Sequence, residues 1–168
     1  ACREKGFEVI ELPMEKVEKN SLPEGPRCFV SFELFEHLHD PALFLRKLHE
    51  LMDPGDHFVM TTLSAAGLDI LVLWEKSRAV FPPHHLNFFT PDSIEILMED
   101  IGFENVKVET PGKLDLSIVE NNLDLLKDSK KKFISNILKN TTKQYKENFQ
   151  RYLQEQKLSS HMRIIVKK

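Results

Sequence analysis

The segment from Arg27 to Leu63 constrains the fold more than any other part of the chain. Residues 27–31 are apolar enough for a buried strand, and Asp40-Pro41 supplies an N-cap followed by the proline favoured at a first helical position. Apolar residues then recur at helical spacing, Pro54-Gly55 turns the chain, and His57–Leu63 is rich in apolar and β-branched residues. This order predicts a βαβ unit with a right-handed crossover, and therefore an α/β fold with a parallel sheet.

Ligands of open parallel sheets bind outside the carboxyl ends of the strands, which here are Ser31–Glu36 and Thr61–Ser64. Two adjacent histidines, His84 and His85, lie in a Pro-Pro-His-His segment before the next helix and are expected to face these strand ends. A neutral histidine can act as a general base near pH 7. His85 and His84 are therefore candidate catalytic residues, with helix capping or a bond to a backbone carbonyl as the alternative role.

Further elements are predicted around this unit. A helix follows Thr90, because Thr90-Pro91 is an N-cap signal and Gly102 suits the position after the last helical turn. The apolar side of Gly67–Val80 is wide, which is typical of a helix that covers a pocket but also of ordinary packing. The other predicted elements are strands at Phe7–Leu12, Val106–Thr110 and Met162–Val166, the last of them inserted into the sheet, and one or two amphipathic helices within Asn121–Leu158.

Four short motifs occur in a distinctive order and spacing. They are FELFEHLHDP at residues 32–41, the DPGD turn at 53–56 with its following strand, FPPHHLNFFTP at 81–91, and IGF at 101–103 before another strand. Together they resemble the class I S-adenosylmethionine-dependent methyltransferases, in the branch of ubiquinone-type and other small-molecule O-methyltransferases. The resemblance covers about residues 6–112 and implies a doubly wound, Rossmann-like sheet with strand order 3-2-1-4-5-7-6.

The resemblance also implies a function and a cofactor. It implies transfer of the methyl group of S-adenosylmethionine to a small-molecule acceptor, for which we expect a hydroxyl group. The segments after the third and fourth strands of the family line the cofactor, and they correspond here to Met14, Glu15, Ser31, Phe32 and Glu33. These five residues are the candidate cofactor-binding residues, although each would also suit an ordinary surface loop.

One family feature is absent from this sequence. The glycine-rich GxGxG turn that approaches the cofactor does not occur, because Gly6 and Gly25 stand alone, and the chain begins with Ala1. We therefore expect one partial methyltransferase domain that lacks the family's N-terminal strands and is inactive by itself. Its expected parts are a core at 1–112, a helical insertion at 113–158 and the last strand at 159–168. An exposed sheet edge at Cys28–Ser31 would then either recruit Phe7–Leu12 or favour self-association.

Two other functions compete with this interpretation. His37-Leu38-His39-Asp40 is similar to the HxHxDH start of zinc-dependent hydrolases, but the aspartate comes one residue too early and the closing histidine is absent. We therefore expect no metal site. The alternative function is a non-catalytic interaction module derived from a methyltransferase fold, acting through its lysine-rich helices.

Charge and composition exclude several classes of partner. The 168 residues carry a net charge of −3 with a pI near 6.2, which gives no basic field for nucleic acid. No apolar stretch approaches the roughly 20 residues that span a bilayer, and no signal peptide is visible. The two cysteines are isolated, as is usual in a reducing compartment. We expect a cytoplasmic protein with a small-molecule substrate and no nucleic-acid or membrane partner.

Overall fold

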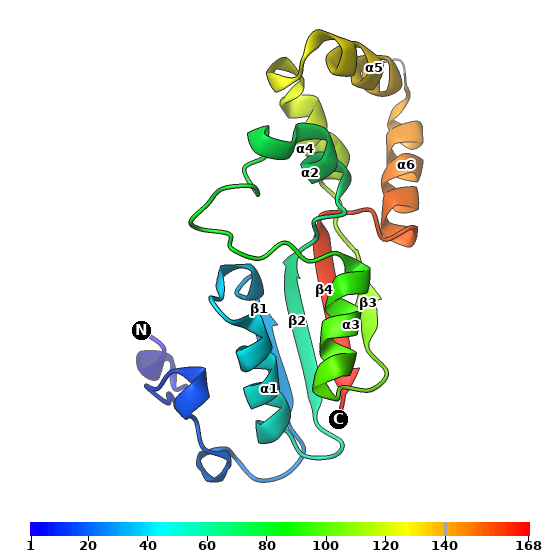
Figure 1. Ribbon diagram of the computed structural model, residues 1–168. Coiled ribbons are helices and arrows are strands. Elements are labelled where there is room, and N and C mark those ends of the chain that lie inside the picture. The colour runs from blue at the N-terminus through cyan, green and yellow to red at the C-terminus, as the bar shows by residue number, and fades with distance from the viewer. Residues whose placement is uncertain (140) are drawn as a thin grey trace.

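A computed structural model describes residues 1–139 and 141–168 and contains a four-stranded sheet (Figure 1). The strands are β1 (Cys28–Phe32), β2 (His57–Leu63), β3 (Lys107–Glu109) and β4 (His161–Lys167), in the order β1-β2-β4-β3. β1 and β2 are parallel, whereas β4 is antiparallel to both of its neighbours. The predicted insertion of the last strand into the sheet is confirmed.

Two helices begin where their sequence signals predict. α1 (Pro41–Leu51) is capped by Asp40, whose side chain accepts a 2.8 Å hydrogen bond from the amide of Leu43. α3 (Pro91–Ile101) is capped by Thr90 in a reciprocal arrangement with Ser93, and it ends at Gly102, whose φ of 108° lies in the left-handed region. The βαβ unit and the helix that follows Thr90 are therefore confirmed.

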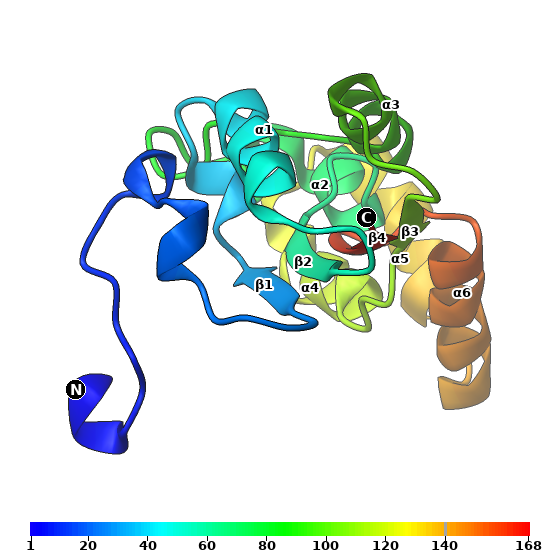
Figure 2. The same ribbon diagram turned by 90° about the horizontal axis from the view of Figure 1, so that it is seen from below.

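α1 and α3 lie side by side on one face of the sheet (Figure 2). Because side chains alternate between the two faces of a strand, every second residue of β2 and β4 points toward these helices. The core formed there consists mainly of Leu45, Leu48, Phe58, Met60, Ile94, Met98, Met162, Ile164 and Val166. On the opposite face Val30 and Phe32 are 59% and 61% exposed.

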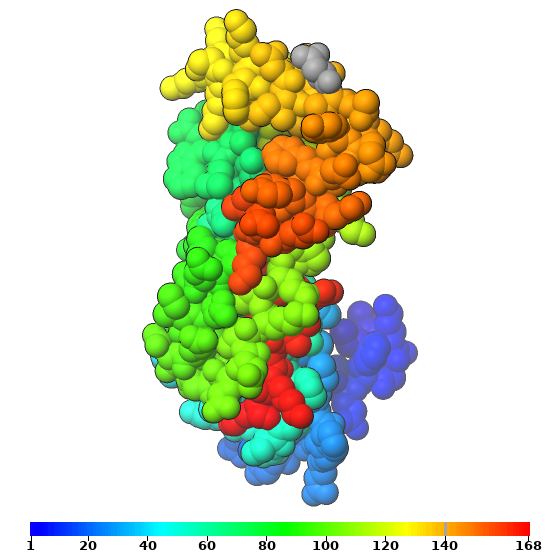
Figure 3. Space-filling model, turned by 90° about the vertical axis from the view of Figure 1, so that its right-hand side faces the viewer, coloured from blue at the N-terminus to red at the C-terminus, as the bar shows by residue number. Residues whose placement is uncertain are grey.

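The remaining helices form a second layer beyond the carboxyl ends of β1 and β2 (Figures 1 and 3). They are α2 (Leu68–Leu73), α4 (Asp115–Asn121), α5 (Asp128–Lys139) and α6 (Lys143–Glu155). These helices have their own apolar core, made by Val72, Leu116, Val119, Leu123, Leu138 and Leu153. α5 and α6 are the predicted amphipathic helices. None of the described helices has the length and apolar character that crossing a bilayer requires.

Two predicted elements differ in the structure. Phe7–Leu12 forms no strand, because no neighbouring strand satisfies its backbone groups, and its apolar side chains stay exposed. The helix predicted within Gly67–Val80 ends at Leu73, since Trp74 adopts a φ of 48°, and a 3₁₀ turn at Trp74–Lys76 follows. β1 remains the edge strand of the sheet, so self-association through this edge stays a prediction that sedimentation can test.

Candidate functional site

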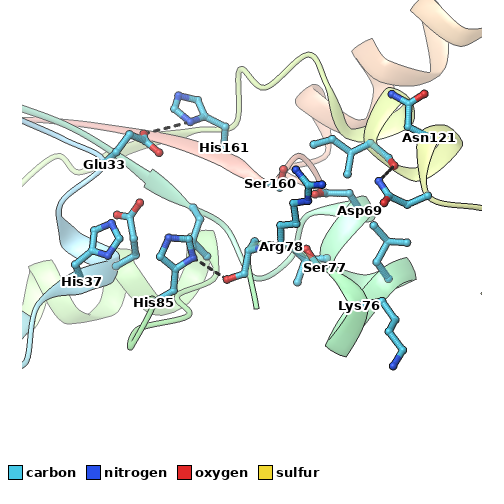
Figure 4. A pocket seen from close by; sticks show the side chains of 17 residues that line it. Glu33, His37, Asp69, Lys76, Ser77, Arg78, His85, Asn121, Ser160 and His161 are labelled. Atoms are coloured by element: carbon cyan, nitrogen blue, oxygen red, sulfur yellow. Dashed lines mark hydrogen bonds and ion pairs between the residues drawn. The ribbon is translucent and has the colours of Figure 1, made fainter. Parts of the chain in front are cut away.

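A cavity of about 670 Å³ lies between the carboxyl ends of β1 and β2 and the helical layer (Figure 4). Loops, strands and helices from distant parts of the sequence all contribute to its wall. Its ionisable lining residues are Glu33, Glu36, His37, Asp69, Lys76, Arg78, His85 and His161. This placement agrees with the rule that ligands of parallel sheets bind beyond the strand ends.

The two histidine-containing motifs of the sequence are hydrogen-bonded to each other at this cavity. The ring Nδ1 of His37 donates to the carbonyl oxygen of His84 over 2.6 Å. The side-chain amide of Asn87 donates to the carbonyl oxygen of Leu38 over 2.6 Å, and the backbone amide of Asn87 donates to the carbonyl oxygen of Glu36. These bonds hold the His84–Asn87 loop against the turn after β1.

Hydrogen bonding fixes the tautomer of His85, which is half-buried in the cavity wall. Its Nδ1 lies 2.7 Å from the carbonyl oxygen of Ala79. Because a carbonyl oxygen only accepts, Nδ1 must carry the proton, and the neutral ring therefore has its lone pair at Nε2. Nε2 of His85 can therefore accept a proton or coordinate a metal ion.

His84 has a different position from its neighbour. Its ring is exposed and stacks on Phe81 at 5.3 Å between ring centroids, and it is not among the residues that line the cavity. The part of His84 that reaches the site is its carbonyl oxygen, which accepts from His37. Of the two candidate catalytic histidines, the structure brings only the side chain of His85 into the cavity.

A second hollow, of about 540 Å³, lies beside the first and gathers most of the candidate cofactor residues. Met14, Ser31, Phe32 and Glu33 line it, whereas Glu15 does not. The Ser31 hydroxyl is buried and has no hydrogen-bond partner among the described residues. Because buried polar groups are normally paired, this hydroxyl suits a ligand with a polar group of its own.

Glu33 lines both hollows and is held in an uncommon conformation. Its φ of 49° lies in the left-handed region, which is strained for a residue with a side chain. The Thr61 hydroxyl donates to Glu33 Oε1 over 2.6 Å, and Nδ1 of His161 lies 3.5 Å from the same oxygen (Figure 4). Glu33 therefore forms the boundary between the two hollows.

Several lining residues were not singled out from the sequence, among them Glu36, Asp69 and His161. Glu36 is only 3% exposed and accepts a 2.7 Å hydrogen bond from the Thr62 hydroxyl. Asp69 comes from α2 and His161 from the start of β4. The adjacent Glu36-His37 pair was a usable signal, because it follows a predicted strand end, but nothing in the sequence brings His161 close to β1.

Asp69 has a perturbed ionisation equilibrium. It is 3% exposed, and its Oδ1 has no hydrogen-bond partner among the residues described. Burial raises the pKa of Asp69 above its ordinary value of 3.8; a hydrogen bond from the Ser160 side chain lowers it, and the nearby Asp115 carboxylate raises it further. Ionised Asp69 therefore opposes folding at neutral pH.

Replacing Asp69 by asparagine is expected to stabilise the protein at pH 7, by about 0.5–2 kcal/mol, the range typical of favourable single substitutions. The gain should grow as the pH rises from about 3.8 through the raised pKa of the folded state and then stay constant, because only the ionised form is penalised. Urea unfolding at several pH values measures this. Asp100→Asn, on the exposed surface of α3, is the control. An Asp69→Asn protein that is less stable than the wild type at pH 7 would contradict this account.

Three solved structures with similar folds are methyltransferases. A SAM-dependent methyltransferase from Archaeoglobus fulgidus has 18% identity and a TM-score of 0.58 over 98% of this chain and 69% of its own. A SAM-dependent methyltransferase from Thermotoga maritima, a possible histamine N-methyltransferase, has 13% identity and a TM-score of 0.56. That match covers 99% of this chain and 66% of the other chain. Phosphoethanolamine N-methyltransferase 2 of Haemonchus contortus, in complex with S-adenosyl-L-methionine, has 16% identity and a TM-score of 0.50. That match covers 84% of this chain and 33% of the other chain.

These likenesses confirm the Rossmann-like α/β fold, and the chain spans from about a third to about two thirds of the length of these structures. No curated protein matches the sequence significantly. The sequence model of a family described as "Methyltransferase domain" matches residues 3–108, which is more than half of the chain. The chain therefore belongs to this family of methyltransferase domains.

Proposed function

We propose that this protein transfers the methyl group of S-adenosylmethionine to a hydroxyl group of a small molecule, as in the ubiquinone-type and other small-molecule O-methyltransferases. The observation that carries the proposal is the pair of adjoining hollows that share Glu33. Four of the five candidate cofactor residues line one hollow, and His85, whose lone pair is at Nε2, lines the other. A donor and an acceptor bound in adjoining hollows would meet at their common boundary.

The residues of the smaller hollow fit the cofactor. Met14 offers an apolar surface for a flat ring, and Ser31 offers a buried hydroxyl that lacks a partner among the described residues. Phe32 and Glu33 complete the candidate set at the end of β1, and Glu15 follows Met14 just outside the lining. When bound there, S-adenosylmethionine would supply an electrophilic methyl group.

His85 is the proposed general base. Nε2 would take the proton of the acceptor hydroxyl, while Nδ1–H stays bonded to the Ala79 carbonyl oxygen and keeps the ring in place. His84 has a supporting role, because its carbonyl oxygen orients His37. The larger cavity has the volume of a site for a metabolite-sized ligand, so we place the acceptor there. We also propose that the enzyme is cytoplasmic and that it has no nucleic-acid or membrane partner.

Transfer of labelled methyl groups tests this function. An active preparation of the enzyme is incubated with methyl-labelled S-adenosylmethionine and with sets of phenols, sugars and amines of matched size. We expect label in a hydroxyl-bearing compound and none in its deoxy analogue. Label in amines alone would contradict the proposed acceptor class. Residues 1–168 alone are proposed to be inactive and to bind the cofactor weakly, because no glycine-rich turn occurs among them.

The interaction-module alternative has one observation in its favour. Phe133 on α5 and Tyr145 on α6 are 64% and 68% exposed, which is unusual for aromatic side chains and typical of contact surfaces. If the rate of methyl transfer is unchanged in Phe133→Ser and Tyr145→Ser, catalysis does not need these two side chains, as expected of a contact surface separate from the active site.

A further inference from the structure

Three potential metal ligands converge in the larger cavity. Glu36, His37 and His85 each offer one ligand atom, and these atoms all lie within 4.8 Å of one another. Figure 4 shows the side chains of His37 and His85 next to each other. The two imidazole rings are 4.8 Å apart between centroids. Two of the ligands come from the turn after β1 and the third from a loop 48 residues later, so the fold rather than the local sequence assembles the group.

The hydrogen bonds around the two histidines are those of preoriented metal ligands. Nδ1 of His37 donates to the His84 carbonyl oxygen, and Nδ1 of His85 donates to the Ala79 carbonyl oxygen. Each neutral ring is therefore in the tautomer that leaves Nε2 free. A histidine that ligates a metal through one ring nitrogen almost always donates its other N–H to a carbonyl, carboxylate or water.

Glu36 supplies the charge of the group. Its side chain is almost completely buried, and the Thr62 hydroxyl donates to its Oε2 over 2.7 Å, which leaves Oε1 for another partner. Among the described residues, no lysine or arginine forms an ion pair with Glu36. A buried carboxylate without a cationic residue beside it is costly unless a cation or proton compensates for its charge.

The positions of the ligands are fixed by main-chain bonds. The amides of Leu86 and Asn87 both donate to the carbonyl oxygen of Glu36, over 2.8 and 3.1 Å. These bonds connect the loop that carries His85 to the turn that carries the other two ligands. His39, which the sequence pattern grouped with His37, is exposed and does not belong to the cluster.

We propose that Glu36, His37 and His85 bind one divalent first-row transition-metal ion, such as Zn²⁺, with its remaining coordination positions open to the cavity. Two imidazoles and one carboxylate favour such an ion over Mg²⁺ or Ca²⁺, which prefer oxygen ligands. This revises the expectation of no metal site, which rested on the sequence pattern at His37–Asp40.

The consequence for methyl transfer rests on the proposed function. A bound metal ion lowers the pKa of a hydroxyl group that coordinates it. With the ion bound, the lone pair of His85 would serve in coordination, and the proton of the acceptor hydroxyl would pass to solvent water. Without the ion, the same nitrogen accepts the proton directly.

Metal binding is measured without cofactor or acceptor. The 168-residue chain is freed of metal and titrated with Co²⁺, followed by visible absorption, and with Zn²⁺, followed by calorimetry. We expect one equivalent of either ion to bind. His37→Ala and His85→Ala should each weaken binding by at least about 100-fold, since loss of an outer-shell partner alone costs 10–100-fold. The wild type and His39→Ala, which lacks only an exposed histidine outside the cluster, are the controls and should bind equally.

Glu36→Gln is included in case an alanine variant fails to fold, because it keeps the shape of the side chain and removes its charge. It should also lose tight binding while its circular dichroism stays native. The proposal is overturned if no ion binds, or if folded His37→Ala, His85→Ala and Glu36→Gln proteins bind as well as the controls. A failed methyl-transfer assay leaves this result unaffected, because neither cofactor nor acceptor is present in the titration.

Discussion

Replacing His85 by alanine in the active, metal-free enzyme should lower kcat by about 10²–10⁴-fold, the usual effect of losing a general base. The affinity for S-adenosylmethionine should change little, because His85 lines the larger cavity and is not among the residues of the smaller hollow. Steady-state kinetics with calorimetric cofactor binding separates the two effects. A residue that only supported the fold would lower both together.

His84→Ala is the matched control for this experiment. It removes an adjacent imidazole of the same loop, but it keeps the carbonyl oxygen that accepts from His37. Its effect on kcat should therefore be much smaller. If both variants turn over as fast as the wild type, the loop is structural and another group deprotonates the acceptor.

Replacing Asp115 by alanine should lower the free energy of unfolding by about 3–5 kcal/mol, the largest effect on stability that we expect from a polar residue. Asp115 is 1% exposed and accepts three hydrogen bonds, from the amide of Ser160 at 2.7 Å, the Ser159 hydroxyl at 2.7 Å and the Gln150 side chain at 2.6 Å. Each buried donor that loses its partner costs about 1–3 kcal/mol. Relief of the repulsion on Asp69 offsets only part of this loss.

The position of Asp115 explains why its loss also matters for the site. It connects α4 and α6 to the residues that enter β4, and Ser160 and His161 line the larger cavity. Urea unfolding measures the effect. Asp115→Asn is the control and should cost less, because it keeps the side-chain shape and one acceptor oxygen. A loss below about 1 kcal/mol for Asp115→Ala would contradict the role given to this network.

The parts of the fold that could be predicted are those with local signals. Asp40-Pro41 and Thr90-Pro91 start helices because a capping side chain and a proline act within one turn of the chain. β2 has its predicted limits, His57 and Leu63, because Pro54-Gly55 turns the chain just before it. The prediction of a strand at Phe7–Leu12 was wrong, because a strand forms only beside another strand to which its backbone can hydrogen-bond, and a local sequence pattern does not show whether one is present.

The candidate site was predictable only in part, for the same reason. His85 and Glu33 belong to motifs whose resemblance pointed to them, and both line the larger cavity. The grouping of Glu36 with His85 was not predictable, because it depends on main-chain bonds between two loops about 50 residues apart. Asp69 gave no signal, since an acidic residue in the first turn of a short helix usually faces solvent.

Mapping the cofactor on the protein tests the central claim most directly. S-adenosylhomocysteine is titrated into isotope-labelled protein to millimolar concentration and followed by NMR, which detects the weak binding expected of residues 1–168 alone. We predict that the amide signals of Met14, Ser31, Phe32 and Glu33 shift together along one saturating curve, while those of α5 and α6 stay unchanged. If the signals of these four residues do not shift, or if only signals of α5 and α6 shift, the result contradicts the proposal that this chain forms part of a methyltransferase site.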